Sequence, residues 1–256
     1  MPYADNEGIR IHYKTEGEGP PLVLQHWSLA TMENWYDYGY VSALKNDYRL
    51  VLLDARGHGG SDKPHTPDAY ELEKRVGDIV AVLDDLGIAK AHYFGYSMGG
   101  WIGFGLARYA PERFRSLILG GAAPYASNME ELRQFIRVGI EKGPEALVAM
   151  WETEYGAEPS ELRERMLAYD YETLLVVAQD HESLEAVLPT MKMPCLLYAG
   201  EMDKYQPIKE CARQIANATF FTLPGLDHGG AIGRSDEVLP HVKRFLAKVE
   251  QQTGAS

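Results

Sequence analysis

The chain has 256 residues, 45 % of them hydrophobic, which is enough to bury a substantial core in one large domain or two small ones. Its 37 acidic and 25 basic side chains give a formal net charge of −12, which repels nucleic-acid phosphates and anionic lipid, so we expect a small-molecule partner, no nucleic acid and no membrane. Two cysteines are too few for a disulfide framework, and no signal-peptide or membrane-spanning pattern occurs, so the composition predicts a cytoplasmic protein.

The first predicted element is a half-exposed edge strand over residues 9–14, where apolar and polar side chains alternate until the Gly- and Pro-rich residues 16–21. Short apolar runs follow, of the kind that forms strands covered on both faces: residues 22–24, 50–53, 92–94, 117–119, 195–198 and 219–222. Helical patterns separate them, the clearest over residues 76–86 and the last over residues 235–249. This alternation predicts an α/β fold with a mainly parallel central sheet and helices on both faces.

One stretch interrupts the alternation. Residues 125–189 contain one helical pattern after another and no strand-like run. We therefore expect an α/β core made of residues 1–124 and 190–256, and a helical cap, residues 125–189, inserted after the sixth strand. Such an insertion would cover the carboxyl edge of the sheet, where open α/β sheets bind their ligands.

The strongest local motif is Gly95-Tyr96-Ser97-Met98-Gly99-Gly100, which lies between a strand-like run and a helical stretch. A sharp strand-to-helix turn with a serine at its centre needs glycines two positions away on both sides, because neighbouring backbone passes close by. The turn would present the Ser97 hydroxyl as a nucleophile and aim the Met98 N–H at a developing oxyanion. The alternative is an ordinary glycine-rich turn, which this position between strand and helix disfavours.

A serine hydroxyl needs a base, and the base needs a carboxylate that fixes its tautomer. His228 follows the last strand-like run and precedes the last helix, so it is the candidate base among eight histidines. Asp203 follows the run that ends at residue 198, and it is the candidate acid; its alternative role is to cap the helix expected near residue 207. Glu201 and Asp227 are rivals, but Glu201 leaves its strand too early and Asp227 is adjacent to His228. The order serine, aspartate, histidine is the one that this turn motif requires.

Together with residues 95–100, three further segments carry a family resemblance: residues 54–61 (Asp-Ala-Arg-Gly-His-Gly-Gly-Ser), residues 200–203 and residues 227–228. Over about residues 9 to 248 the chain resembles the α/β-hydrolase superfamily, and most of all the compact bacterial members with a short helical cap. That group includes carboxylesterases, lactonases, C–C bond hydrolases and cofactor-free perhydrolases. The resemblance also implies that Asp54 and Arg56 belong to a buried scaffold turn, with a structural role.

The sequence departs from the family at the second oxyanion donor. Family members usually carry His-Gly-x after the strand that supplies this N–H, whereas this chain has Gln25-His26-Trp27-Ser28. Depending on the alignment, the donor is the N–H of Trp27 or that of Ser28. A badly placed donor would lower the rate by roughly 10²–10³-fold.

These observations predict a serine esterase that cleaves small to medium uncharged carboxylic esters through an acyl-enzyme, with no metal and no organic cofactor. The serine argues against epoxide or haloalkane hydrolysis, which in this family needs a carboxylate nucleophile. Alternatives are a perhydrolase, lactonase or C–C bond hydrolase with the same triad, or a non-enzymatic ligand receptor. Residues expected to line the substrate pocket, with a plain core role as the alternative, are His26, Trp27, Tyr96, Met129, Met150, Trp151 and Tyr155.

Overall fold

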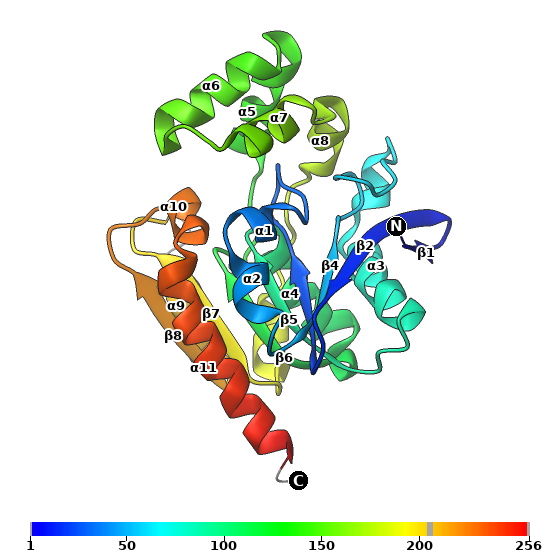
Figure 1. Ribbon diagram of the computed structural model, residues 1–256, viewed down its shortest axis with the longest axis vertical. Coiled ribbons are helices and arrows are strands. Elements are labelled where there is room, and N and C mark those ends of the chain that lie inside the picture. Colours follow the sequence, from blue (N-terminus) through cyan, green and yellow to red (C-terminus); the bar gives the residue numbers. More distant parts are fainter. Residues whose placement is uncertain (1, 204–206, 255–256) are drawn as a thin grey trace.

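The computed structural model describes residues 2–203 and 207–254, which form an eight-stranded sheet with strand order β1-β2-β4-β3-β5-β6-β7-β8 (Figure 1). Strands β3 to β8 run parallel, whereas β1 and β2 are antiparallel to their neighbours. The strands are Tyr3–Asn6, Ile9–Glu16, Pro21–Gln25, Arg49–Leu53, Ala91–Tyr96, Phe114–Gly120, Cys195–Gly200 and Ala218–Leu223. The predicted mainly parallel sheet is confirmed. The prediction of an edge strand at residues 9–14 is wrong, because β1 pairs with the outer side of β2.

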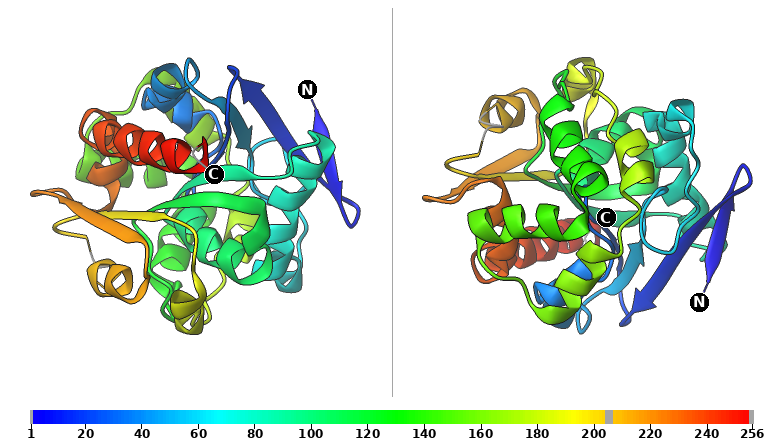
Figure 2. Two further views of the ribbon diagram at one scale, coloured as in Figure 1. Left: turned by 90° about the horizontal axis from the view of Figure 1, so that it is seen from below. Right: turned by 90° about the horizontal axis from the view of Figure 1, so that it is seen from above.

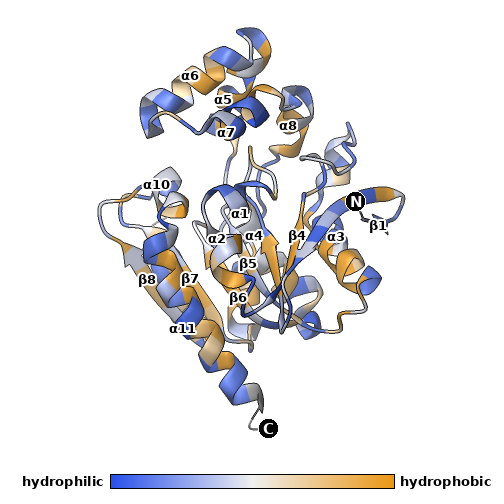
Figure 3. Cartoon of the chain, viewed as in Figure 1, coloured by the Kyte–Doolittle hydropathy of each residue, from blue (hydrophilic) through white to orange (hydrophobic). Residues whose placement is uncertain are grey.

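Two helical layers cover the sheet, as Figure 2 shows end-on. Helices α1 (Asn34–Asp37), α2 (Tyr40–Leu44), α10 (His228–Gly233) and α11 (Ser235–Gly254) contact one face, and α3 (Leu72–Asp85), α4 (Met98–Tyr109) and α9 (Ile208–Gln214) contact the other. Successive strand residues point to opposite faces, so Leu22 and Leu24 pack with the first layer and Val23 with the second. Because both faces are covered, the strands β3 to β7 are mainly apolar along their length (Figure 3).

Between β6 and β7 the chain forms α5 (Glu130–Glu141), α6 (Pro144–Tyr155), α7 (Ser160–Leu167) and α8 (Tyr171–Val177). We call these four the inserted helices. They lie together beyond one end of the sheet (Figure 1) and bury two small apolar clusters of their own, centred on Ile136 and Val148. Three short 3₁₀ helices complete the described secondary structure: Pro67–Tyr70, Pro111–Arg113 and Glu185–Thr190. In the described part of the chain, none of the helices combines the length and the apolar character needed to cross a membrane.

Candidate active site

Ser97 occupies a strained turn between β5 and α4. Its backbone has φ 51° and ψ −113°, a region that side-chain-bearing residues rarely adopt. A Cβ added to Gly95 would lie 2.3 Å from the Gly99 carbonyl oxygen, and one added to Gly99 would lie 2.3 Å from the Gln25 carbonyl oxygen. The glycines on both sides of Ser97 are therefore needed because backbone segments cross at contact distance.

His228 is the first residue of α10, in the loop that follows β8. The Asp227 side chain accepts a hydrogen bond from the Gly230 N–H at 2.7 Å and so caps this short helix. The buried Tyr96 hydroxyl donates to the His228 carbonyl oxygen at 2.6 Å, and its ring lies 5.3 Å from the imidazole. Tyr96, the residue that precedes Ser97, therefore helps to hold His228 in position.

The structure brings the three residues predicted for catalysis together. Nδ1 of His228 lies 2.9 Å from Oδ2 of Asp203, and Nε2 lies 2.9 Å from Oγ of Ser97. A carboxylate at Nδ1 favours the tautomer with its proton there, which leaves the Nε2 lone pair to accept the serine proton. The Asp203 side chain is fully buried, so the ion pair it can form with an imidazolium is screened little by water.

Asp203 does not take its alternative role as a helix cap, and the two rival acids, Glu201 and Asp227, bind other groups. Helix α9 follows Pro207, so Asp203 does not cap it. Glu201 accepts a hydrogen bond from the Gly225 N–H at 3.0 Å, and Asp227 caps α10. Gly200 matters more than the sequence indicates, because a Cβ there would lie 2.2 Å from the Leu226 carbonyl oxygen. This close approach brings the Asp203 turn against the His228 loop.

The residues predicted to supply the oxyanion donors, Met98, Trp27 and Ser28, line the same cavity as Ser97. Met98 begins α4, where a backbone N–H has no partner within the helix and the helix dipole favours negative charge. Trp27 and Ser28 both line the cavity beside Ser97. In a trans peptide the C=O and the N–H point in opposite directions. Because the Trp27 carbonyl accepts a hydrogen bond from the His26 ring, the Ser28 N–H points away from that ring.

His26 is fully buried and lies behind the cavity wall, so it does not line the predicted substrate pocket. Its Nε2 accepts from the Ala55 N–H at 3.0 Å, which puts the ring proton on Nδ1, where it is donated to the Trp27 carbonyl at 2.7 Å. Burial lowers the pKa of His26, so the ring stays neutral. The histidine therefore fixes the loop that carries Trp27 and Ser28 instead of touching a ligand.

The scaffold turn at residues 54–61 ties the neighbouring loops together. Asp54 accepts from the Met32 N–H at 2.9 Å and the Gly60 N–H at 2.8 Å, and it contacts His12 Nδ1 at 2.9 Å. Burial alone would raise the pKa of Asp54, but these hydrogen bonds, first of all the one with His12, bring the pKa below its ordinary value. Arg56 forms a buried ion pair with Asp78 of α3. The turn thus joins the loop after β3 to the second helical layer.

A cavity of about 420 Å³, which we call the Ser97 cavity, opens beside the nucleophile candidate. Of the predicted pocket residues, it is lined by Trp27, Met129, Trp151 and Tyr155. Tyr96 is buried beneath it, and Met150 is 47 % exposed on the outer side of α6. The helical period explains this difference, because Trp151 falls on the face between the buried Leu147 and Val148, whereas Met150 lies about 100° around the helix from Trp151.

Sequence reasoning missed further residues of this region. Gly121 has φ +59°, and a Cβ there would lie 2.9 Å from His228 Cε1 and 2.8 Å from Tyr96 Cζ. Its position directly after a buried strand was the available signal. Trp101 and His181 also line the Ser97 cavity, and no pattern in the sequence joins two residues so far apart.

A sequence profile described as the alpha/beta hydrolase fold matches residues 20–149, just over half of the chain. The chain belongs to the α/β-hydrolase fold family. The match covers the Ser97 turn and most of the parallel sheet, and the eight-stranded architecture agrees with it.

Three similar proteins carry the names of three different activities. A Bacillus subtilis (strain 168) protein, provisionally named 2-succinyl-6-hydroxy-2,4-cyclohexadiene-1-carboxylate synthase, is 26 % identical over 224 residues, which is 78 % of this chain and 80 % of that one. Mouse epoxide hydrolase 4 is 37 % identical over 116 residues, 44 % of this chain but only 32 % of that protein. The crystal structure of the enol-lactonase from Burkholderia xenovorans LB400 has a TM-score of 0.83 and 28 % identity, covering 96 % of this chain and 100 % of that chain. Membership of the family therefore does not determine which reaction this α/β-hydrolase catalyses.

Proposed function

We propose that this α/β-hydrolase cleaves small to medium uncharged carboxylic esters with Ser97 as nucleophile, His228 as general base and Asp203 as the residue that orients the base. The observation that carries the proposal is the continuous relay of two 2.9 Å contacts from Asp203 through His228 to Ser97, with the serine beside an apolar cavity. Nucleophile, base and orienting acid in this geometry are the signature of acyl transfer.

The chemistry proceeds in two halves. Ser97 Oγ attacks the ester carbonyl while His228 Nε2 takes its proton, and the oxyanion is held by the Met98 N–H and by that of Trp27 or Ser28. His228 then gives the proton to the leaving alkoxide, which departs as the alcohol and leaves an acyl-serine. Water repeats the sequence on the acyl-enzyme and releases the acid. His228 ends in its starting protonation state, so no cofactor is required for proton balance.

The walls of the Ser97 cavity favour an uncharged substrate. Among the described residues that line it there is no lysine or arginine, and most are apolar or aromatic. Its volume of about 420 Å³ falls within the usual size of small-molecule sites, roughly 300–1,000 Å³. The acidic net charge adds to this preference by disfavouring anionic esters.

We further propose that residues 125–189 act as a cap over a hydrolase core of residues 1–124 and 190–256. The inserted helices contribute Leu132, Phe135, Trp151 and Tyr155 to the Ser97 cavity, whereas Ser97 and His228 come from the core. A ligand would therefore be enclosed between the two parts. Cys195 and Cys211 are both buried free thiols, as is common in the reducing cytoplasm, where we expect the protein to act.

Lactone hydrolysis is the second candidate, since the enol-lactonase similarity extends over nearly the whole chain. A lactone is a cyclic ester, so the same attack by Ser97 opens the ring, and the alkoxide that leaves stays attached to the acyl group. Epoxide hydrolysis is disfavoured, because in this fold it uses a carboxylate where the chain has Ser97.

The test is turnover of a panel of p-nitrophenyl esters, aliphatic lactones, peracid formation from acetate and peroxide, and vinylogous diketones. We expect ester hydrolysis, lowered roughly 10⁴–10⁶-fold in Ser97→Ala. Ser42→Ala is the matched control, because this serine is exposed on α2 and does not line the Ser97 cavity, and its loss should leave the rate within about twofold of wild type. Full ester hydrolysis by Ser97→Ala would refute the assignment of the nucleophile. Ligand binding without turnover of any substrate would favour the receptor alternative.

A further inference from the structure

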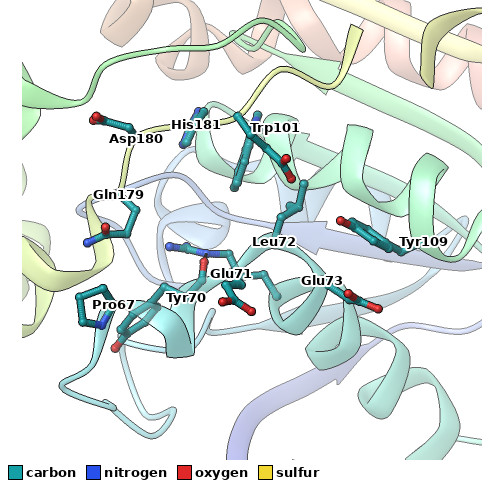
Figure 4. A pocket seen from close by; sticks show the side chains of 12 residues that line it. Pro67, Tyr70, Glu71, Leu72, Glu73, Trp101, Tyr109, Gln179, Asp180 and His181 are labelled. Atoms are coloured by element: carbon teal, nitrogen blue, oxygen red, sulfur yellow. Dashed lines mark hydrogen bonds between the residues drawn. The ribbon is translucent and has the colours of Figure 1, made fainter. Parts of the chain in front are cut away.

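A second cavity of about 500 Å³ lies next to the Ser97 cavity, between the start of α3, helix α4 and the segment that leads out of the inserted helices. We call it the Arg75 cavity. Figure 4 shows it from close by, with Trp101 and His181 side by side at its upper edge. These two residues are the ones that also line the Ser97 cavity. The pair therefore forms the wall between the two spaces.

The two rings of this wall are stacked. Their centroids are 3.8 Å apart and their planes differ by only 7°, so the two rings are in direct contact and leave no space between them. The Trp101 Nε1 atom is buried, and within the described residues it has no hydrogen-bond partner. The indole therefore acts here through its ring surface and not through its N–H group.

The two halves of the wall are held by different parts of the protein. Trp101 lies in the first turn of α4, is 6 % exposed, and its backbone N–H donates to the Ser97 carbonyl at 2.8 Å. His181 lies on the segment after α8, which exchanges two backbone hydrogen bonds with Ser127 at 3.1 and 2.9 Å. One ring is thus fixed to the helix of the nucleophile, and the other is carried by the inserted segment.

The wall is uncharged near neutral pH. Burial lowers the pKa of His181 to about 3, the positive charge of Arg75 acts in the same direction, and Asp180 opposes them. A neutral imidazole can stack on the indole and face an alkyl chain without the desolvation penalty of an imidazolium. The Arg75 cavity behind it is mixed in character, with Leu72 and Tyr109 beside Glu71 and Glu73.

We propose that the Trp101–His181 pair sets substrate length, because it closes the Ser97 cavity against the longer arm of an ester. The proposal rests on the ester hydrolysis proposed above and adds the specificity-determining residues. With the His181 ring in place, the arm is confined to the Ser97 cavity. With the ring removed, the two cavities join, and an arm that is several methylenes longer can pass over Trp101 into the Arg75 cavity.

The test compares His181→Ala with His181→Phe, which keeps an aromatic ring in the stack. Substrates form two series, p-nitrophenyl esters from acetate to dodecanoate and acetates of alcohols of the same lengths, so that either arm is sampled. For wild type and His181→Phe we expect kcat/KM to fall beyond a medium chain. For His181→Ala we expect the fall to begin several carbons later, with a gain of about fourfold for each further methylene buried.

An unchanged length profile in both series for folded His181→Ala would overturn the proposal, as would the same extension in His181→Phe. Trp101→Leu opens the wall from the other side and should lengthen the profile in the same way. Calorimetric binding of n-alkanols reads the length limit without turnover, and the same shift is expected there. If the protein hydrolyses no ester but His181→Ala still binds longer alkanols, the proposed function alone is refuted. If the protein hydrolyses esters but His181→Ala leaves the length limit unchanged, the role of the Trp101–His181 pair alone is refuted.

Discussion

Replacing Ser97 by alanine and by glycine should give two inactive proteins of different stability. Both variants lose the hydroxyl that lies 2.9 Å from His228, so they differ only in how well they tolerate φ 51° and ψ −113°. A side-chain-bearing residue held in such a region costs roughly 1–3 kcal/mol, whereas the greater freedom of unfolded glycine costs about 0.5–1 kcal/mol. The difference between the midpoints of these ranges leaves Ser97→Gly more stable than Ser97→Ala by about 1.25 kcal/mol.

Urea denaturation followed by circular dichroism measures this difference directly, and a thermal scan should show a rise in Tm of about 2.5–5 °C for Ser97→Gly over Ser97→Ala. Equal m-values in the two variants would show that both expose the same surface on unfolding, so that their midpoints compare stability directly. If Ser97→Ala proved as stable as Ser97→Gly or more so, the turn would not hold Ser97 under strain.

Three further predictions concern the acid, the loop beneath the histidine and alkaline pH. Asp203→Asn should lower kcat roughly 10⁴-fold with little change in KM in ester assays, because an amide can stabilise the wrong tautomer of His228; a loss below tenfold would contradict the orienting role. Gly121→Ala should lower kcat/KM by about 10²-fold, because its Cβ would displace the His228 ring. Gly87→Ala is the control: Gly87 also has a positive φ, but a Cβ there would meet nothing within 4 Å, so only stability should fall. Equal kcat/KM values in the two variants would contradict the displacement of His228. Burial, first of all, raises the pKa of Tyr13, Tyr70 and Tyr171 from 10.0 to about 12, so each should stabilise the fold fully below pH 10 and lose this contribution as the pH rises through 12. Between pH 10 and 12 each tyrosine lowers the free energy of unfolding by up to about 1.4 kcal/mol per pH unit. Arg75 acts in the opposite direction, because burial lowers its pKa to about 10. Urea midpoints that stayed constant above pH 10 would contradict the expected loss of stability.

The sequence was sufficient to predict that Ser97, Asp203 and His228 would meet, and the physical reason is the sheet. Each residue follows a strand, and the carboxyl ends of parallel strands lie at one edge, so positions 131 and 25 residues from His228 converge there. The alternation of Leu22, Val23 and Leu24 between the two core faces follows from the same regularity. Local sequence patterns therefore predict well the contacts that the regular geometry of the sheet imposes on residues far apart in the chain.

The cavity walls could not be predicted in the same way. Met150 and Trp151 are adjacent and both apolar, and only the packing of α6 decides that one faces solvent and the other the cavity. His26 lies beside Trp27 in sequence, but its two ring hydrogen bonds keep it behind the wall. The stack of Trp101 on His181 joins residues 80 positions apart and depends on how the inserted segment returns to the core. No spacing in the chain encodes such a contact.

The residue labelled by a fluorophosphonate tests the central claim most directly. Intact-mass and peptide mass spectrometry of the treated wild-type protein should show a single adduct on Ser97, formed far more slowly in Asp203→Asn and absent in Ser97→Ala. An adduct on another residue, or a protein that hydrolyses esters yet stays unlabelled at Ser97, would contradict the assignment of Ser97 as the nucleophile.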